Sequence, residues 1–176
     1  DYQANKNLLD QAISEGVKKF IYVASLHGDK MRNLKLCAAK EQFVDDLKKS
    51  GMNFCIIRPN GFFSDLGEFL EMANKGHMYL FGKGEHRLNP IAGEDLAREI
   101  VKTLHTNQCE LSIGGPNIYS HNDLVHLASI TLNKKIKKIY FPYWIKNLLL
   151  FVLRKLTSST TYGPIEFFLT TLSMDM

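Results

Sequence analysis

Residues 16–25 read GVKKFIYVAS, and this stretch decides the fold class. Gly16 follows a segment with apolar side chains at helical spacing and stands where a helix ends. Residues 20–24 are a short apolar run of β-branched and aromatic residues, which is typical of a strand buried on both faces. Ser25 comes directly after that run. The stretch therefore predicts a helix that returns through a glycine turn into a buried strand.

The same pattern continues beyond residue 25. A second amphipathic helix runs to Ser50, and Gly51 ends it. Residues 54–57 (FCII) predict another buried strand, which ends at Arg58-Pro59 because proline cannot donate a hydrogen bond to a sheet. Alternating helices and strands with short turns predict an α/β fold with a doubly wound parallel sheet. Since the first element is a helix, we expect further strands of this sheet to precede it.

The part of the chain after Pro59 predicts shorter elements. Residues 82–84 (GKG) separate two short apolar runs, and we expect them to form a hairpin turn. Ser120 and Asp123 have the spacing of a helix cap with a near capping box. We predict helices at 64–75, 93–104, after 120, at 144–156 and from 165, and strands at 78–81, 88–91, 111–113 and 136–141.

Charge and cysteine content argue against several classes of protein. The net charge is +4, from 22 basic and 18 acidic side chains, and the densest basic cluster, at 134–138, is interrupted by an apolar residue. This favours a solvated face over a nucleic-acid site, which needs a basic stripe with exposed aromatic residues. Cys37, Cys55 and Cys109 form no CxxC pair, which argues against a zinc site and a disulfide framework and favours a cytoplasmic location. The histidines show no metal-ligand spacing.

Residues 144–156 are the longest apolar stretch of the chain. Charged and polar side chains interrupt it, and it is too short to span a bilayer. We interpret it as a helix that packs on its own domain or on a second copy in a homo-oligomer. An amphipathic helix on a membrane surface is the alternative.

Five segments, in the same order along the chain, resemble the atypical and extended short-chain dehydrogenases/reductases, including NmrA-like and epimerase-like members. They are residues 7–12 with 16–25, 39–41, 50–52 with 57–63, 89–97 and 113–116. The resemblance implies a Rossmann-like domain that binds NAD or NADP, with residues 1–62 as its C-terminal half. Residues 63–176 would form a substrate region interleaved with the last sheet strands. The family's glycine-rich phosphate loop has no match here, so we expect it in a preceding part.

The resemblance also assigns catalytic roles. In the family, a Ser or Thr at the position of Ser25 binds a substrate oxygen. The Lys of a Tyr-x-x-x-Lys pair, here Lys40, binds the nicotinamide ribose and lowers the pKa of the tyrosine. Leu36 stands in place of that tyrosine, so the usual proton donor is absent. Either another acid such as His27 acts, or the proton comes from water, or the chain binds the dinucleotide without chemistry.

The remaining site residues also follow from the resemblance. It places Ala24, Ser25, Lys40, Pro59, Asn60, Gly61 and Phe62 against the cofactor, and we assign His27 and Phe63 to the substrate. Five of these residues have a plainer interpretation: Ser25 as a strand-end serine, Lys40 as a surface lysine, His27 as a loop histidine, and Phe62 and Phe63 as core aromatic residues. Arg58 is interpreted as a structural residue that pairs with a carboxylate.

Together these observations predict an NAD(P)-dependent oxidoreductase acting on an unknown small molecule. Two alternatives stay open: an NAD(P)-binding regulator or structural subunit without turnover, and an interaction module that uses the helix at 144–156.

Overall fold

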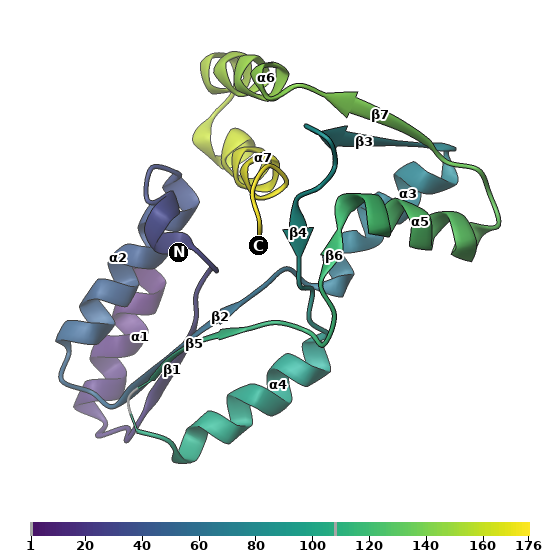
Figure 1. Ribbon diagram of the computed structural model, residues 1–176. Helices are drawn as coiled ribbons and strands as arrows, with labels where there is room; N and C mark the ends of the chain where they lie inside the picture. Colours follow the sequence, from purple (N-terminus) through teal and green to yellow (C-terminus); the bar gives the residue numbers. More distant parts are fainter. Residues whose placement is uncertain (1, 108) are drawn as a thin grey trace. The chain divides into compact units, whose positions relative to one another are not determined.

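The computed structural model describes residues 2–107 and 109–176, which divide into two compact units (Figure 1). The first unit consists of Asp1–Asn60 and Ile91–Gly114, and the second of Gly61–Pro90 and Gly115–Met176. Each unit has its own buried core.

The first unit is built on a parallel sheet of three strands in the order β1-β2-β5. The strands are β1 (Phe20–Val23), β2 (Phe54–Pro59) and β5 (Cys109–Ile113). Every residue of the central strand β2 is buried, as the apolar run predicted. Phe20 lies opposite Phe54, and Pro59 lies opposite Ile113, so all three strands have their carboxyl ends at the same edge. The predicted α/β fold with a parallel sheet is confirmed.

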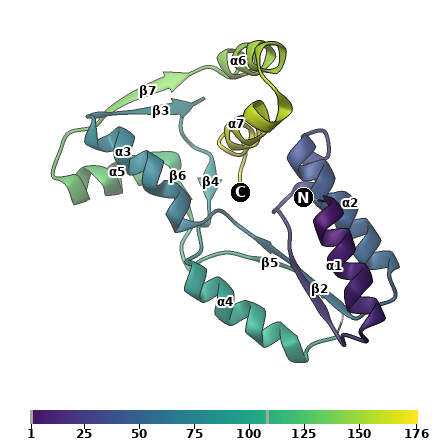
Figure 2. The same cartoon turned by 180° about the vertical axis from the view of Figure 1, so that it is seen from behind.

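Helices cover both faces of this sheet (Figures 1 and 2). One face carries α1 (Tyr2–Ser14) and α2 (Lys35–Lys49), whose apolar sides bury Leu9, Phe43 and Leu47 against β1 and β2. The other face carries α4 (Gly93–Lys102), followed by the short 3-10 helix η3 (Thr103–His105). The short 3-10 helix η1 (Gly28–Met31) lies between β1 and α2. This is the doubly wound arrangement that the alternating pattern predicts.

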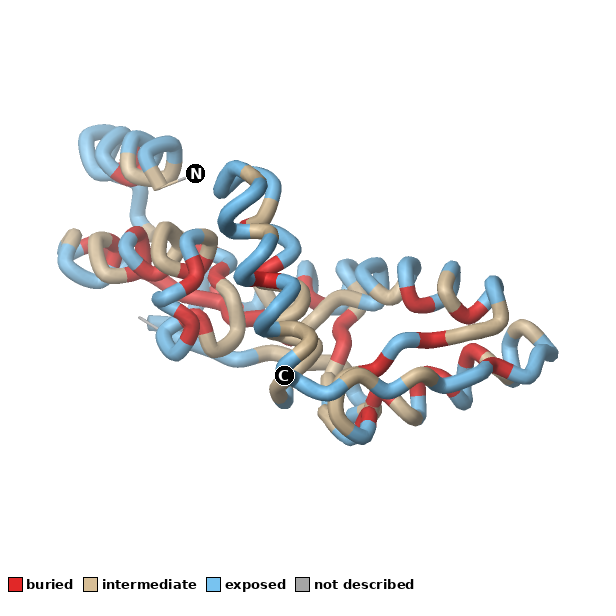
Figure 3. The backbone as a smooth tube through the Cα atoms, turned by 90° about the horizontal axis from the view of Figure 1, so that it is seen from above, coloured by how far each residue is buried: buried red, intermediate tan, exposed pale blue. Residues whose placement is uncertain are grey.

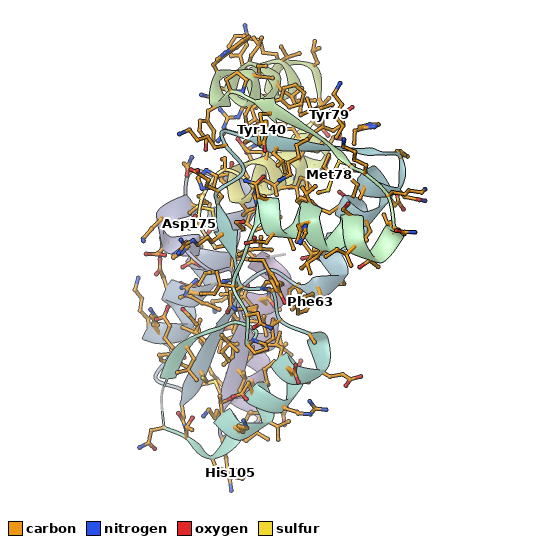
Figure 4. All side chains as sticks on the ribbon, turned by 45° about the vertical axis from the view of Figure 1, so that its right-hand side comes forward. Phe63, Met78, Tyr79, His105, Tyr140 and Asp175 are labelled. Atoms are coloured by element: carbon orange, nitrogen blue, oxygen red, sulfur yellow. The ribbon has the colours of Figure 1, made fainter. Side chains whose placement is uncertain are left out.

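The second unit contains two small sheets and four helices. Strand β3 (His77–Phe81) pairs in parallel with β7 (Lys137–Phe141), and β4 (Arg87–Leu88) pairs antiparallel with β6 (Tyr119–Ser120). The helices are α3 (Gly67–Asn74), preceded by η2 (Phe63–Leu66), then α5 (His121–Leu132), α6 (Tyr143–Leu156) and α7 (Ser159–Thr171). Figure 4 labels Met78, Tyr79 and Tyr140 on the β3–β7 pair.

The core of the second unit lies between β3 and the helices α3 and α5. Phe69, Met78 and Val125 are among its buried members. Figure 3 shows buried positions alternating with exposed ones along the helices, as expected where one helical face is apolar.

Two predicted features of the second unit are wrong. Residues 82–84 do turn, with Gly82 and Gly84 at φ of 60° and 69°, but the flanking strands do not pair with each other. Each strand finds a partner from much later in the chain, so the turn is not a hairpin. Helix α7 begins at Ser159 rather than near residue 165, with Pro164 inside it. By contrast, the capping box of Ser120 and Asp123 is confirmed.

Cys37 is free and buried, whereas Cys55 is disulfide-bonded, which the wide spacing of the cysteines did not predict. Spacing along the chain does not show which positions become neighbours on adjacent strands. Within the described residues, none of the helices has the length and hydrophobicity that crossing a membrane requires.

Candidate functional site

A buried arginine on the central strand of the first unit contacts α2, β5 and the turn after β1. Arg58, on β2, makes a two-point ion pair with Glu41 of α2, with Nη1–Oε1 and Nη2–Oε2 distances of 2.7 and 2.9 Å. Its Nε donates to Glu110 of β5 at 2.7 Å, and Nη1 donates to the carbonyl oxygen of Ser25 at 2.8 Å. The Arg58 and Glu41 side chains are only 8% and 1% exposed. The interpretation of Arg58 as a structural residue paired with a carboxylate is confirmed.

The charges of this network stabilise one another. The hydrogen bond to Glu41 raises the pKa of Arg58, although burial alone would lower it. Burial would raise the pKa of Glu110, but hydrogen bonds from Lys48 and Arg58 outweigh burial and lower it. Lys48 reaches Glu110 at 2.6 Å. Two cations therefore face two carboxylates, and the buried guanidinium has partners for its charge.

The turn after β1 closes directly over the ion pair. A Cβ atom on Gly28 would collide with Glu41 Oε1 and would lie 3.3 Å from Arg58 Nη1. His27 has φ of 51°, in the left-handed region, and the Gly28 N–H donates to the Ser25 carbonyl oxygen at 3.2 Å. A side chain at position 28 would displace the Glu41 carboxylate, so the ion pair and this turn depend on each other.

Ser25 and Lys40 present free polar groups beside this network. Among the described residues, neither the Ser25 hydroxyl nor the Lys40 ammonium makes a hydrogen bond or an ion pair. Lys40 Nζ lies 5.8 Å from the centroid of the Tyr22 ring, on β1 three residues before Ser25. Such a cation–π contact leaves the N–H donors available to a ligand. Leu36, one turn earlier on α2, stands where the family pattern has its tyrosine.

Tyr22 is a feature that sequence reasoning missed. Its ring packs edge-on against Phe43, with 4.6 Å between centroids, and its hydroxyl is buried without a hydrogen-bond partner in the described structure. Burial raises the pKa of Tyr22, Glu41 raises it further, and Arg58 opposes the shift. The signal was a tyrosine inside a strand predicted to be buried on both faces, where the hydroxyl must find a hydrogen-bond partner among apolar side chains.

The other predicted site residues divide between the two units. Ala24 is buried at the end of β1, where its N–H donates to the Ile57 carbonyl oxygen at 2.8 Å. Pro59 ends β2, two residues beyond the predicted apolar run, and the Asn60 N–H donates to the Ile113 carbonyl oxygen at 2.8 Å. These residues lie at the carboxyl edge with Ser25, whereas Gly61, Phe62 and Phe63 belong to the second unit.

Glu41 is the second functional residue that sequence reasoning missed. It sits one turn from both Cys37 and Val44, on the buried side of α2. A carboxylate on an apolar helical stripe needs a buried partner, and that was the available signal. No group of three or more potential metal ligands exists among the residues that the structure describes.

Part of the chain is similar in sequence to known proteins. No family model matches the chain. Two proteins named divinyl chlorophyllide a 8-vinyl-reductase, from Cucumis sativus and Arabidopsis thaliana, are each 33% identical to it over 127 residues. The matches cover 66% of this chain and 30% of each relative, so the chain spans less than a third of their length.

Solved structures share the fold at low sequence identity. An NADPH-dependent quinone oxidoreductase from Escherichia coli matches with a TM-score of 0.73 and 15% identity, over 90% of this chain and 56% of that one. A UDP-glucose 4-epimerase from Thermotoga maritima matches with a TM-score of 0.65 and 18% identity, over 78% of this chain and 55% of that one. These likenesses confirm the Rossmann-like fold that the resemblance implies.

Replacing Glu41 with Gln is expected to destabilise the chain strongly. The substitution leaves the buried Arg58 guanidinium without its main countercharge, which typically costs about 3 kcal/mol or more. Asp45→Asn is the matched control, because Asp45 pairs with Arg32 on the exposed side of the same helix and such pairs contribute about 0–1 kcal/mol. Urea unfolding of both variants measures the difference, and equal losses would contradict a buried network.

Replacing Tyr22 with Phe is expected to leave stability unchanged or to increase it by about 1 kcal/mol. The change removes a buried hydroxyl without a partner and keeps the ring under Lys40. Tyr2→Phe serves as the control, since the Tyr2 hydroxyl donates to Asp46 at 2.5 Å and its loss should lower stability slightly. A large loss in Tyr22→Phe, measured by thermal unfolding, would show that the hydroxyl is bonded.

Proposed function

We propose that this chain forms the nicotinamide side of an NAD(P)-binding site in an oxidoreductase. The observation that carries the proposal is the unpaired Lys40 ammonium, held over the Tyr22 ring beside the end of β1. Ligands of open α/β sheets bind outside the carboxyl ends of the strands. Ser25 adds a free hydroxyl at that end, and solved structures of the same fold carry NADPH or NAD in their names.

The residues at this edge fit such a cofactor. Lys40 would donate hydrogen bonds to the ribose hydroxyls, and Ser25 would donate to a carbonyl oxygen of the carboxamide or the substrate. Pro59 and Asn60 would line the neighbouring strand end. A bound nicotinamide supplies or accepts a hydride. Both NAD and NADP satisfy these contacts, so either cofactor fits this half of the site.

The absence of a tyrosine at position 36 limits which reactions the site could catalyse. Leu36 offers no proton, so carbonyl reduction by the usual Tyr-x-x-x-Lys pair has no donor at that position. The plant relatives are named as reductases of a vinyl group. We therefore extend the proposal to a substrate with a carbon–carbon double bond: one carbon takes the hydride and the other takes a proton from water or from an acid such as His27.

A second candidate function uses the same site to bind NAD(P) without catalysing a reaction. Leu36 in place of tyrosine also suits an NAD(P)-binding regulator or structural subunit. Three other features stay predictions: the cytoplasmic location, the homo-oligomer and the role of α6 in binding a partner. The plant relatives are named as chloroplastic.

Lys40→Ala is expected to weaken NADPH or NADH binding about tenfold to a hundredfold. The substitution removes hydrogen bonds from a charged donor, which contribute about 1.5–3 kcal/mol. Fluorescence titration of the protein measures the affinity. Lys35→Ala is the matched control, because Lys35 is an exposed lysine at the start of the same helix.

Three outcomes separate the candidates. Binding weakened only in Lys40→Ala, with nucleotide oxidation on adding a vinyl-bearing substrate, supports the reductase. Binding with no turnover across a substrate screen supports the regulator. Equal affinities of both variants and the unmodified protein would contradict the nicotinamide site.

A further inference from the structure

Helix α6 packs against its own unit with its cationic side. Arg154 Nε donates to the buried Glu166 carboxylate of α7 at 2.7 Å. Lys146 Nζ donates to Ser173 Oγ, just after α7, at 2.6 Å. Leu150, halfway between these two cations, is the buried residue of α6. Positions 146, 150 and 154 are four residues apart and share one helical face. A surface helix of a globular protein usually does the reverse and turns its apolar face to the core.

The opposite face of α6 is apolar and exposed. Six apolar side chains of this helix are between 40% and 78% exposed: Trp144, Leu148, Leu149, Phe151, Val152 and Leu156. At 100° per residue they lie on one continuous arc of the helix, opposite Leu150 and α7 (Figures 1 and 2). Single exposed leucines are common on protein surfaces, whereas a contiguous apolar patch of this kind marks a surface that binds something.

The chain that leads into α6 and forms it carries only positive charge. Residues 134–155 contain seven lysines and arginines and no aspartate or glutamate. Among the described residues, Arg154 is the only one of these seven that forms an ion pair. The four lysines at 134–138 are exposed. Lys155 Nζ lies 4.5 Å from the centroid of the Phe151 ring, so its stem follows the apolar face while its ammonium stays at the surface. Apolar area and unbalanced positive charge therefore occur together.

This charge argues against a second copy of the chain as the partner of the apolar face. A dimer through α6 would be symmetric, so each protomer would present the same stretch to the other. Two sets of cations would then approach each other, and residues 134–155 offer no carboxylate to offset them. The surface that suits this face combines apolar depth with negative charge at its rim.

An anionic lipid bilayer has both properties. Helices that lie in the plane of a membrane surface place Trp, Phe and Leu among the acyl chains and keep Lys and Arg beside the headgroups. Trp144 begins the exposed face and Lys155 lies near its end. Each lysine or arginine close to an anionic membrane strengthens binding about fivefold. Apolar burial and charge therefore act in the same direction on such a surface.

We propose that α6 docks the protein on the surface of a membrane that contains anionic lipids. The apolar face of α6 enters the boundary between headgroups and acyl chains, and the lysines of residues 134–155 contact the anionic headgroups. The bonds of Lys146 and Arg154 to Ser173 and Glu166 hold the helix with this face outward. The inference goes beyond the proposed function, because it concerns the second unit and needs no dinucleotide.

Tryptophan fluorescence with lipid vesicles tests the proposal, because Trp144 is the only tryptophan of the chain and lies on the exposed face. Vesicles of phosphatidylcholine with about one third phosphatidylserine should shift its emission to shorter wavelength, since the indole leaves water. Vesicles of phosphatidylcholine alone should bind much more weakly, and added salt should weaken binding to the anionic vesicles.

Two double variants locate the binding face. Leu148→Asp with Phe151→Asp should weaken vesicle binding at least about a hundredfold, because two large apolar side chains no longer enter the bilayer. Leu127→Asp with Ile130→Asp is the matched control. Both of its residues are exposed on α5 of the same unit, with the same spacing and the same added charge, so most of the binding should remain.

A single charge variant keeps the test decisive if the α6 double variant does not fold. Lys155→Gln leaves the apolar face intact and should weaken binding to the anionic vesicles about fivefold. Lys75→Gln, at an exposed lysine at the end of α3, should weaken it less.

Four results would overturn the proposal: no binding to the anionic vesicles, equal binding to both kinds of vesicle, equal losses in the two double variants, or short-wavelength Trp144 emission in the free protein. The last result would show that protein already covers the face, and a dimer in solution that Leu148→Asp with Phe151→Asp separates would identify the cover as a second copy.

Discussion

The ion pair between Arg58 and Glu41 is the constraint on which the first unit depends. A guanidinium on the central strand is buried by the sheet itself, and an isolated buried charge is too costly to keep. Carboxylates from α2 and β5 and a carbonyl from the end of β1 therefore converge on it. Their convergence sets how α2 is rotated about its axis. Because Lys40 is the residue before Glu41, that rotation also sets where the free ammonium lies.

Much of the first unit could be predicted because its signals are local. The apolar runs at β1 and β2, the glycine turns and the amphipathic α2 each follow from neighbouring residues. The sequence predicted that Arg58 pairs with a carboxylate, but it could not identify Glu41 and Glu110 as the partners, because these residues meet only after the sheet has formed. A proline or a charge shows where a strand ends, but partners 17 and 52 residues away depend on register.

The second unit shows the same limit more strongly. Local spacing predicted the cap at Ser120, yet the strands on either side of residues 82–84 pair with β6 and β7 instead of with each other. The His86 ring contacts the Tyr143 hydroxyl and the Asp175 carboxylate, which lie 57 and 89 residues away along the chain, so no motif could join them.

Hydrogen exchange of residues 24–31 in the double variant Glu41→Leu with Arg58→Met tests the central claim most directly. Replacing a buried ion pair by apolar residues is often neutral for global stability, so unfolding should change little. If the pair holds the carboxyl edge, the amides of Ala24 and Gly28 will exchange faster while those of β2 stay protected. Unchanged exchange at both amides, with global stability also unchanged, would show that the edge holds without the ion pair and would contradict the account.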